Sequence, residues 1–111
     1  MALLRIHRLK KKKEIEMALK SGRQRGGIAF RLFFYPNKEA RTRYAFVISK
    51  KTLKKATDRN RLRRRVTSWI QKNPKLLSFS FDVVCIFMSR VGQLTQKELY
   101  ADFEKNFTLL P

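Results

Sequence analysis

The chain has 111 residues, of which 27 are Lys or Arg and 8 are Asp or Glu, so its formal net charge is +19 at pH 7. With 43% hydrophobic residues it is long enough for one small domain, residues 1–111, with a core of its own. Such charge opposes compaction and predicts a polyanionic partner: RNA, DNA or an anionic membrane surface. No run of about twenty apolar residues and no apolar signal core occurs, which argues against a membrane span and against secretion.

Residues 1–8 form a short basic tail, which we expect to become ordered on contact with RNA or on packing against the first helix. The lone His7 is expected at the surface, without a catalytic role. A helix is predicted from about residue 9 to residue 21, with Ile15 and Leu19 facing inward and Gly22 ending it. Residues 22–27, GRQRGG, predict a flexible turn with glycines at positive φ, in which a short extra strand could form.

Aromatic and β-branched residues mark a strand at residues 28–35, IAFRLFFY. One of its two faces must enter the core. The face that carries Arg31 and Phe33 could stack unpaired bases, although aromatic residues at strand spacing more often belong to a core. A polar loop at residues 36–42 predicts a hairpin that leads into a partner strand at residues 43–50.

The most distinctive stretch covers residues 49–69, SKKTLKKATDRNRLRRRVTSW, in which Asp58 is the one acidic residue. Leu62, Val66 and Trp69 form an apolar stripe at helical spacing, which predicts a helix that ends before Asn73-Pro74. We expect Thr57 or Asp58 to cap this helix. Its opposite side carries Asn60, Arg61 and Arg64, with Arg63 and Arg65 on the flanks, so a rigid phosphate-binding surface is predicted.

Residues 78–90 are apolar on both faces and predict a central strand, so strand, helix and strand form a βαβ-type unit. Thr95 and Glu98 predict a capping box for a last helix, whose buried stripe is Leu99, Phe103 and Phe107. This helix is rich in acidic residues and should face away from the nucleic acid. The elements together predict an α+β sandwich with three helices and a mixed sheet of about four strands.

No catalytic constellation is visible in the sequence. The carboxylates are scattered, there is one His, and no metal-binding or phosphate-loop motif occurs. We therefore expect no self-contained active site, no metal site and no cofactor on the protein. The single Cys85 cannot form an internal disulfide, which predicts a reducing, cytoplasmic location.

The run KKATDRNRLRRR, preceded by YAFVISKK, resembles the signature of the bacterial ribonuclease P protein component. Residues 9–22, LKKKKEIEMALKSG, resemble the first helix of that family. Two departures stand out. Thr67 and Ser68 occupy positions where the family usually has Arg and Glu, and Ile15 and Leu19 stand where it often has Phe.

The resemblance implies a ribosomal protein S5 domain 2-like fold with a left-handed crossover. It also implies a cytoplasmic endoribonuclease in which an RNA subunit performs magnesium-dependent hydrolysis and one protein per RNA grips the 5′ leader of precursor tRNA. Contacts with the catalytic RNA are expected from Lys50, Lys51, Lys54, Arg59, Asn60, Arg61, Arg63 and Arg64. The leader cleft is expected to involve Ile15, Leu19, Arg31 and Phe33.

Three other readings are compatible with the charge. A ribosomal-type or other structured-RNA-binding protein would bind RNA without any part in catalysis. A DNA-binding protein would place the Arg-rich helix in a major groove, but no second helix of a helix-turn-helix precedes it. A membrane-surface role is the weakest, because the apolar face with Trp69 is expected in a core.

Overall fold

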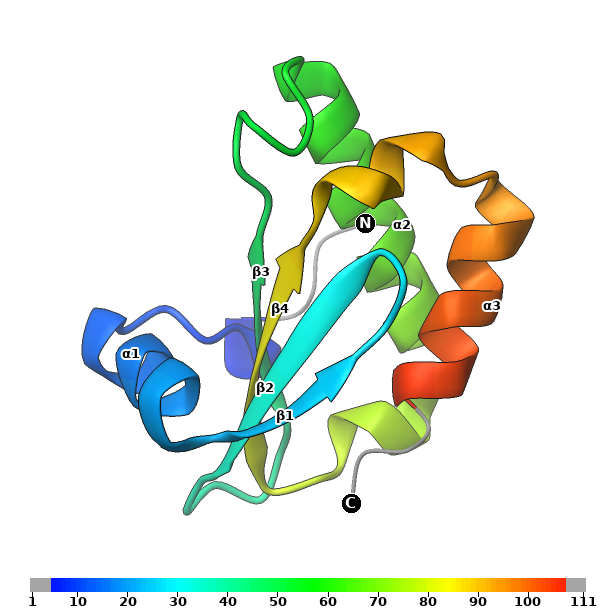
Figure 1. Ribbon diagram of the computed structural model, residues 1–111. Helices are drawn as coiled ribbons and strands as arrows, with labels where there is room; N and C mark the ends of the chain where they lie inside the picture. Colours follow the sequence, from blue (N-terminus) through cyan, green and yellow to red (C-terminus); the bar gives the residue numbers. More distant parts are fainter. Residues whose placement is uncertain (1–4, 108–111) are drawn as a thin grey trace.

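A computed structural model describes residues 5–107 of the chain. A four-stranded mixed sheet separates helix α1 on one face from α2 and α3 on the other (Figure 1). The predicted α+β architecture with three helices is confirmed. In chain order the elements are η1 (Arg5–His7), α1 (Lys12–Ser21), β1 (Arg23–Gly26), β2 (Phe30–Pro36), β3 (Arg43–Val47), α2 (Ala56–Gln71), η2 (Pro74–Leu77), β4 (Phe81–Phe87), η3 (Ser89–Gln93) and α3 (Gln96–Phe107).

Strand β4 is central in the sheet, as its two apolar faces predict. The strand order is β1-β2-β4-β3, and β4 pairs antiparallel with β2 and parallel with β3. The hairpin expected between the second and third strands is therefore wrong: β4 lies between them, and the antiparallel hairpin partner of β2 is β1. The most apolar strand takes the position where both faces are covered. The loop after β2 crosses the end of β4, where Asn37 N–H donates to Ser80 O at 2.9 Å.

The main core lies between the sheet and helices α2 and α3. Phe30 of β2 lies 5.6 Å from Phe103 and 5.4 Å from Phe107, measured between ring centroids. Trp69 of α2 lies 5.5 Å from the same two rings, so the apolar stripe of the basic helix packs into the core as expected. No helix among residues 5–107 is both long and apolar enough to cross a membrane.

A smaller cluster lies under α1, where Leu9, Ala18 and Val84 are buried. Helix α1 begins at Lys12, three residues later than predicted, because the Leu9 N–H donates to Tyr44 O of β3 at 2.8 Å and the backbone stays extended through Lys11. The expectation of a surface His7 is also wrong: its side chain is 9% exposed. Residues 5–8 pack against β3 and the loop before it, and not only against the first helix. Residues 1–4 lie outside the described residues.

The glycines around α1 serve close packing. No residue in the described part of the chain has positive φ, so the predicted positive-φ turn is wrong. Gly22 does end α1, and its N–H donates to Ala18 O. A Cβ on Gly22 would overlap the Ala18 carbonyl oxygen and lie 2.9 Å from Phe34 O. A Cβ on Gly27 would lie 2.8 Å from a carboxylate oxygen of Asp102.

The helix ends agree only in part with expectation. Thr57 and Asp58 lie inside α2, whose N-cap is Lys55 with no side-chain cap hydrogen bond. The helix stops before Asn73-Pro74, as predicted. The capping box of α3 is confirmed: Glu98 N–H donates to Thr95 Oγ1 at 3.1 Å, and Thr95 N–H donates to Glu98 Oε1 at 2.9 Å. These Thr95 hydrogen bonds lower the pKa of Glu98.

Candidate nucleic-acid interface

The sheet face under α1 is built of three cross-strand rows. Phe33, Val84 and Ala45 form the middle row, and Tyr35, Asp82 and Arg43 form the row on one side of it. On the other side Arg31, Ile86 and Val47 form a row in which Arg31 and Val47 are exposed. One end of this face is therefore closed by α1 and its contacts, while the other end is open to solvent.

The four side chains predicted for the leader cleft come together on this face. Ile15 and Leu19 of α1 and Phe33 of β2 belong to one apolar cluster, each only partly buried. Arg31 lies two residues from Phe33 on the same face and is exposed. The face thus combines partly accessible apolar side chains with a cation, which suits an unpaired base and its phosphate.

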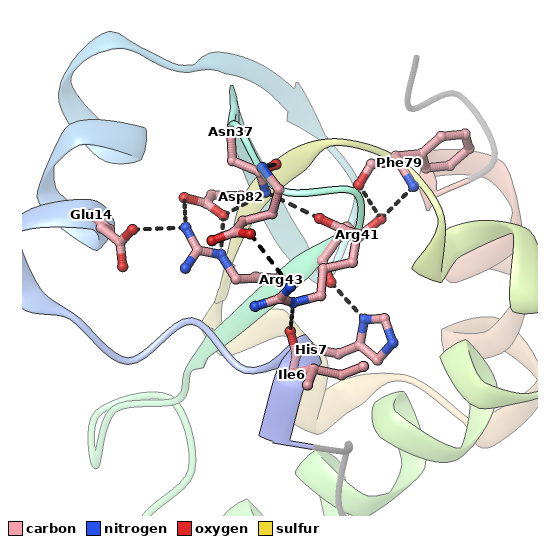
Figure 2. Close-up of polar contacts among 10 residues, drawn as sticks. Ile6, His7, Glu14, Asn37, Arg41, Arg43, Phe79 and Asp82 are labelled. Atoms are coloured by element: carbon pink, nitrogen blue, oxygen red, sulfur yellow. Dashed lines mark hydrogen bonds and ion pairs between the residues drawn. The ribbon is translucent and has the colours of Figure 1, made fainter.

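A partly buried ion-pair network fixes α1 to the sheet (Figure 2). Arg43 Nε donates to Asp82 Oδ1 at 2.8 Å, and Arg43 Nη2 donates to Asp82 Oδ2 at 2.9 Å and to Glu14 Oε2 of α1 at 2.7 Å. Asn37 Nδ2 donates to the same Asp82 Oδ1 at 2.9 Å. The hydrogen bond with Asp82 raises the pKa of Arg43, so the guanidinium stays charged. Glu14 immediately precedes Ile15, so this network sets the position of one wall of the cleft.

Four arginines of α2 and Asn60 divide between two faces of the helix. Asn60, Arg63 and Arg64 face a groove that runs along the outer edge of β3. Arg61 and Arg65 border a different hollow, of about 250 Å³, between α2 and the start of α3. Arg61 also lies 3.9 Å from Asp58, in an exposed ion pair. The predicted set for the catalytic RNA therefore does not form a single surface.

Arg59 has an internal role that the sequence did not reveal. Its Nη1 donates to Leu53 O and to Lys54 O, both at 2.8 Å, and its side chain is half-buried. The guanidinium thereby ties the start of α2 to the preceding loop, where a side-chain cap was expected. An Arg in the first turn or two of a helix that follows a strand is a common pattern. The sequence therefore gave no sign that the Arg59 side chain binds the backbone of the preceding loop.

The predicted contact residues Lys50, Lys51 and Lys54 are exposed on the loop between β3 and α2. This loop extends beyond the end of β3 (Figure 1). It is anchored by Thr52 Oγ1, which donates to Phe87 O at 3.2 Å, and by the Arg59 contacts described above. The lysines therefore project from an ordered loop beside the basic start of α2.

The groove along the outer edge of β3, called here the β3-edge groove, has a volume of about 720 Å³. It combines apolar walls with four cations and one amide. The lining residues that matter for binding are Leu9, Ile15, Ala45 and Val47 on the apolar side and Arg8, Lys10, Asn60, Arg63 and Arg64 on the polar side. Arg8 and Lys10 were missed from the sequence, because only the docking of the N-terminal segment beside β3 brings them to this site. Val47 was missed because it lines the groove only through the position of β3 at the edge of the sheet.

Two buried acidic side chains are engaged in internal bonds. Asp82 binds Arg43, and Asp102 accepts the N–H of Ile28 at 3.1 Å and of Ala29 at 2.9 Å. Within residues 5–107 no three His, Cys, Asp or Glu side chains gather closely enough to hold a metal ion. The chemistry on the cleft and groove surfaces is thus cationic, amide and apolar, as expected for contacts with RNA.

Comparison with known proteins decides which RNA-binding family this surface belongs to. The family model described as Ribonuclease P matches residues 3–110. The ribonuclease P protein component of Fusobacterium nucleatum is 30% identical over 98 residues, which cover 88% of this chain and 87% of that protein. The chain belongs to the ribonuclease P protein family. The resemblance seen in the Arg-Asn-Arg run is confirmed.

Solved ribonuclease P proteins share the fold. The Staphylococcus aureus protein superposes with a TM-score of 0.84 at 19% identity, covering 93% of this chain and 94% of that one. The Thermotoga maritima protein, solved in complex with 1-(4-fluorophenyl)-2-thiourea, gives 0.77 at 22% identity, covering 88% and 94%. Membership of the ribonuclease P family associates the chain with tRNA 5′ processing and implies an RNA partner.

Proposed function

We propose that this chain holds the 5′ leader of precursor tRNA on the α1 face of the sheet while α2 and the loop before it contact the catalytic RNA of ribonuclease P. The observation that carries this proposal is the gathering of Ile15, Leu19, Phe33 and Arg31 on one open face. That face borders the β3-edge groove through Ile15, and Asn60 lies on the other side of the groove. Both RNA segments would then be held by one rigid body.

The chemistry of the face supports a single strand. A partly exposed Phe33 offers a ring against which a base can stack, and Ile15 and Leu19 offer apolar contact to its neighbour. The Arg31 guanidinium can bind a phosphate without regard to sequence, as a leader of variable sequence requires. A duplex presents no unstacked base for the Phe33 ring to contact.

In this proposal the protein performs no bond breaking. The RNA subunit hydrolyses the phosphodiester with magnesium, as the family resemblance implies. The protein neutralises phosphates through Lys50, Lys51 and Lys54 of the loop together with Arg63 and Arg64 of α2, and the neutral amide of Asn60 contributes a hydrogen bond. One protein copy per RNA is expected, in the cytoplasm, where the thiol of Cys85 remains reduced. Burial raises the pKa of that thiol and keeps it unreactive.

The test reconstitutes the protein with a bacterial ribonuclease P RNA and follows precursor tRNA cleavage at low magnesium concentration. Stimulation by the protein, absent with a basic peptide of similar charge, is the expected result. Tight, salt-sensitive RNA binding without stimulation would favour a general structured-RNA-binding protein. Cleavage by the protein alone would contradict the assignment of hydrolysis to the RNA.

Phe33→Ala tests the leader contact directly. Loss of a stacking partner costs about 1–2 kcal/mol, so the Kd of the holoenzyme for precursor tRNA should rise roughly 5- to 30-fold while that for mature tRNA stays nearly constant. Phe33→Leu separates stacking from packing, since Leu still packs against α1 but offers no ring. Tyr100→Ala, on α3 at the opposite face, serves as the control. Equal losses for both tRNAs would contradict the cleft assignment.

A further inference from the structure

Residues 5–10, called here the strap, are tied by three hydrogen bonds to β3 and to the loop that precedes it. Leu9 N–H donates to Tyr44 O of β3 at 2.8 Å. Arg41 Nε donates to Ile6 O at 2.6 Å, and His7 Nδ1 lies 2.8 Å from Thr42 O (Figure 2). Arg8 also forms a parallel bridge with Tyr44. The strap therefore runs alongside an edge strand that would otherwise be open.

The His7 contact is the buried anchor of the strap. A carbonyl oxygen can only accept, so Nδ1 of His7 carries the proton and donates. The acceptor residue is itself rigid: Thr42 Oγ1 donates to Phe79 O and accepts the Phe79 N–H, both at 2.8 Å. The His7 ring is 9% exposed, whereas Arg5 beside it is exposed to solvent. The ring thus fixes the strap to a loop that is held to the segment entering β4.

The strap supplies one wall of the β3-edge groove. Arg8, Leu9 and Lys10 line it on one side, and Asn60, Arg63 and Arg64 of α2 line it on the other. Two walls that both carry cations repel each other, so without an anchor the strap would swing away from α2. A strand of phosphates between the walls would neutralise both sides at once.

We propose that His7 is a positioning residue that holds the strap in place, so that Arg8 and Lys10 grip a single-stranded RNA segment against α2 in the β3-edge groove. This inference rests on the proposed function, in which the single strand is the 5′ leader of precursor tRNA. Leu9 and Val47 provide apolar contact for a base, while the cations of the two walls bind the adjoining phosphates. His7 itself touches no RNA in this arrangement.

The experiment compares four variants in the reconstituted holoenzyme: His7→Ala, His7→Asn, Lys10→Gln and Arg5→Gln. His7→Ala should raise the Kd for precursor tRNA roughly 5- to 10-fold and change that for mature tRNA less than about 2-fold. His7→Asn should restore most of the affinity, because Asn Nδ2 can donate from nearly the position of His Nδ1.

Lys10→Gln should flatten the salt dependence of precursor binding by about 0.7 in log–log slope, as loss of one phosphate contact requires. Arg5→Gln removes a charge from the same strap outside the groove and should leave the slope nearly unchanged.

Hydrogen exchange of the Leu9 amide in the free protein reports the strap without reference to RNA. It should accelerate in His7→Ala and return toward the wild-type rate in His7→Asn. An unchanged exchange rate in His7→Ala would contradict the claim that His7 holds the strap in place. Faster exchange of the Leu9 amide with unchanged affinity for precursor tRNA would contradict the claim that the strap contributes to RNA binding in the β3-edge groove. It would leave the proposed function intact.

If the wild-type holoenzyme did not bind precursor tRNA more tightly than mature tRNA, the proposed function would be contradicted. The role of the strap in binding single-stranded RNA would then be tested with a different RNA. The probe is dodecauridylate bound to the protein alone. Weaker binding by His7→Ala, restored in His7→Asn, would support the strap as a general single-strand clamp. Equal binding by all variants would overturn it.

Discussion

Arginines that look equivalent in the sequence of α2 have different surroundings in the fold. Arg59 donates to two carbonyl oxygens of the preceding loop, whereas Asn60, the next residue, is exposed and faces the β3-edge groove. Arg61, one position further, turns to the opposite flank beside Asp58. A change of one position in the sequence thus replaces a side chain in an internal contact with one that faces the groove.

Arg59→Ala and Asn60→Ala should therefore have opposite phenotypes. Arg59→Ala leaves two carbonyl oxygens without their donor and should lower the free energy of unfolding by about 1–2 kcal/mol. Asn60→Ala removes an exposed amide and should leave stability within about 0.5 kcal/mol while weakening assembly with the catalytic RNA. Denaturant unfolding and RNA binding measured on both variants distinguish the two. A loss of stability in Asn60→Ala that accounts for its loss of binding would contradict the contact.

Among the elements, α1 is the one most dependent on its neighbours. Four consecutive lysines lead into the helix or lie at its start, where positive charge opposes the helix dipole, and no side chain caps it. Its position depends on three tertiary features: the apolar contacts of Ile15 and Leu19, the Glu14–Arg43 ion pair, and the close approach of Gly22 to β2. Because α1 forms one wall of the leader cleft, these features also set the width of the cleft.

Gly22→Ala should displace α1, and Gly26→Ala is the matched control. A Cβ at Gly22 meets two backbone carbonyl oxygens that cannot move aside as a side chain would, whereas a Cβ at Gly26 meets nothing within 4 Å. We expect Gly22→Ala to cost about 1–3 kcal/mol of stability and Gly26→Ala less than about 0.5 kcal/mol. Thermal unfolding checks both variants, and comparable effects would contradict the close approach at Gly22.

At the scale of the whole molecule, charge is separated by the fold. Buried carboxylates are engaged internally, Asp82 with Arg43 and Asp102 with the backbone at Ile28 and Ala29. The cations of the loop before α2 and of the β3-edge groove instead remain at the surface. The net charge of +19 therefore acts outward, and it raises the free energy of the compact state.

Salt should act in opposite directions on folding and on RNA binding. Raising the NaCl concentration from about 0.02 to 0.2 M screens the repulsion among the protein's own positive charges. It should therefore raise the midpoint temperature of thermal unfolding. The same change should weaken RNA binding, with a log–log slope of roughly −3 or steeper if the four groove cations contact phosphates. Parallel melting and binding titrations test this prediction. RNA affinity independent of salt would contradict a phosphate-dominated interface.

Local pattern was sufficient for much of this protein. The apolar stripe of α2, the two-sided apolar β4, the Thr95–Glu98 capping box and the buried stripe of α3 all depend on residues close in sequence, and all are confirmed. The Arg-Asn-Arg run indicated the family for the same reason, since a sequence signature consists of consecutive residues, wherever their side chains point in the fold.

Only the tertiary structure decided which elements are neighbours. Strand periodicity states which side chains share a face but not which strand lies alongside, so β4 replaced the expected hairpin partner of β2. The internal role of Arg59, the space required at Gly22 and the contact of His7 with Thr42 likewise depend on groups that approach only after folding. The sequence by itself determined which side chains each segment buries. The competition among segments for buried positions determined where the exposed basic residues lie.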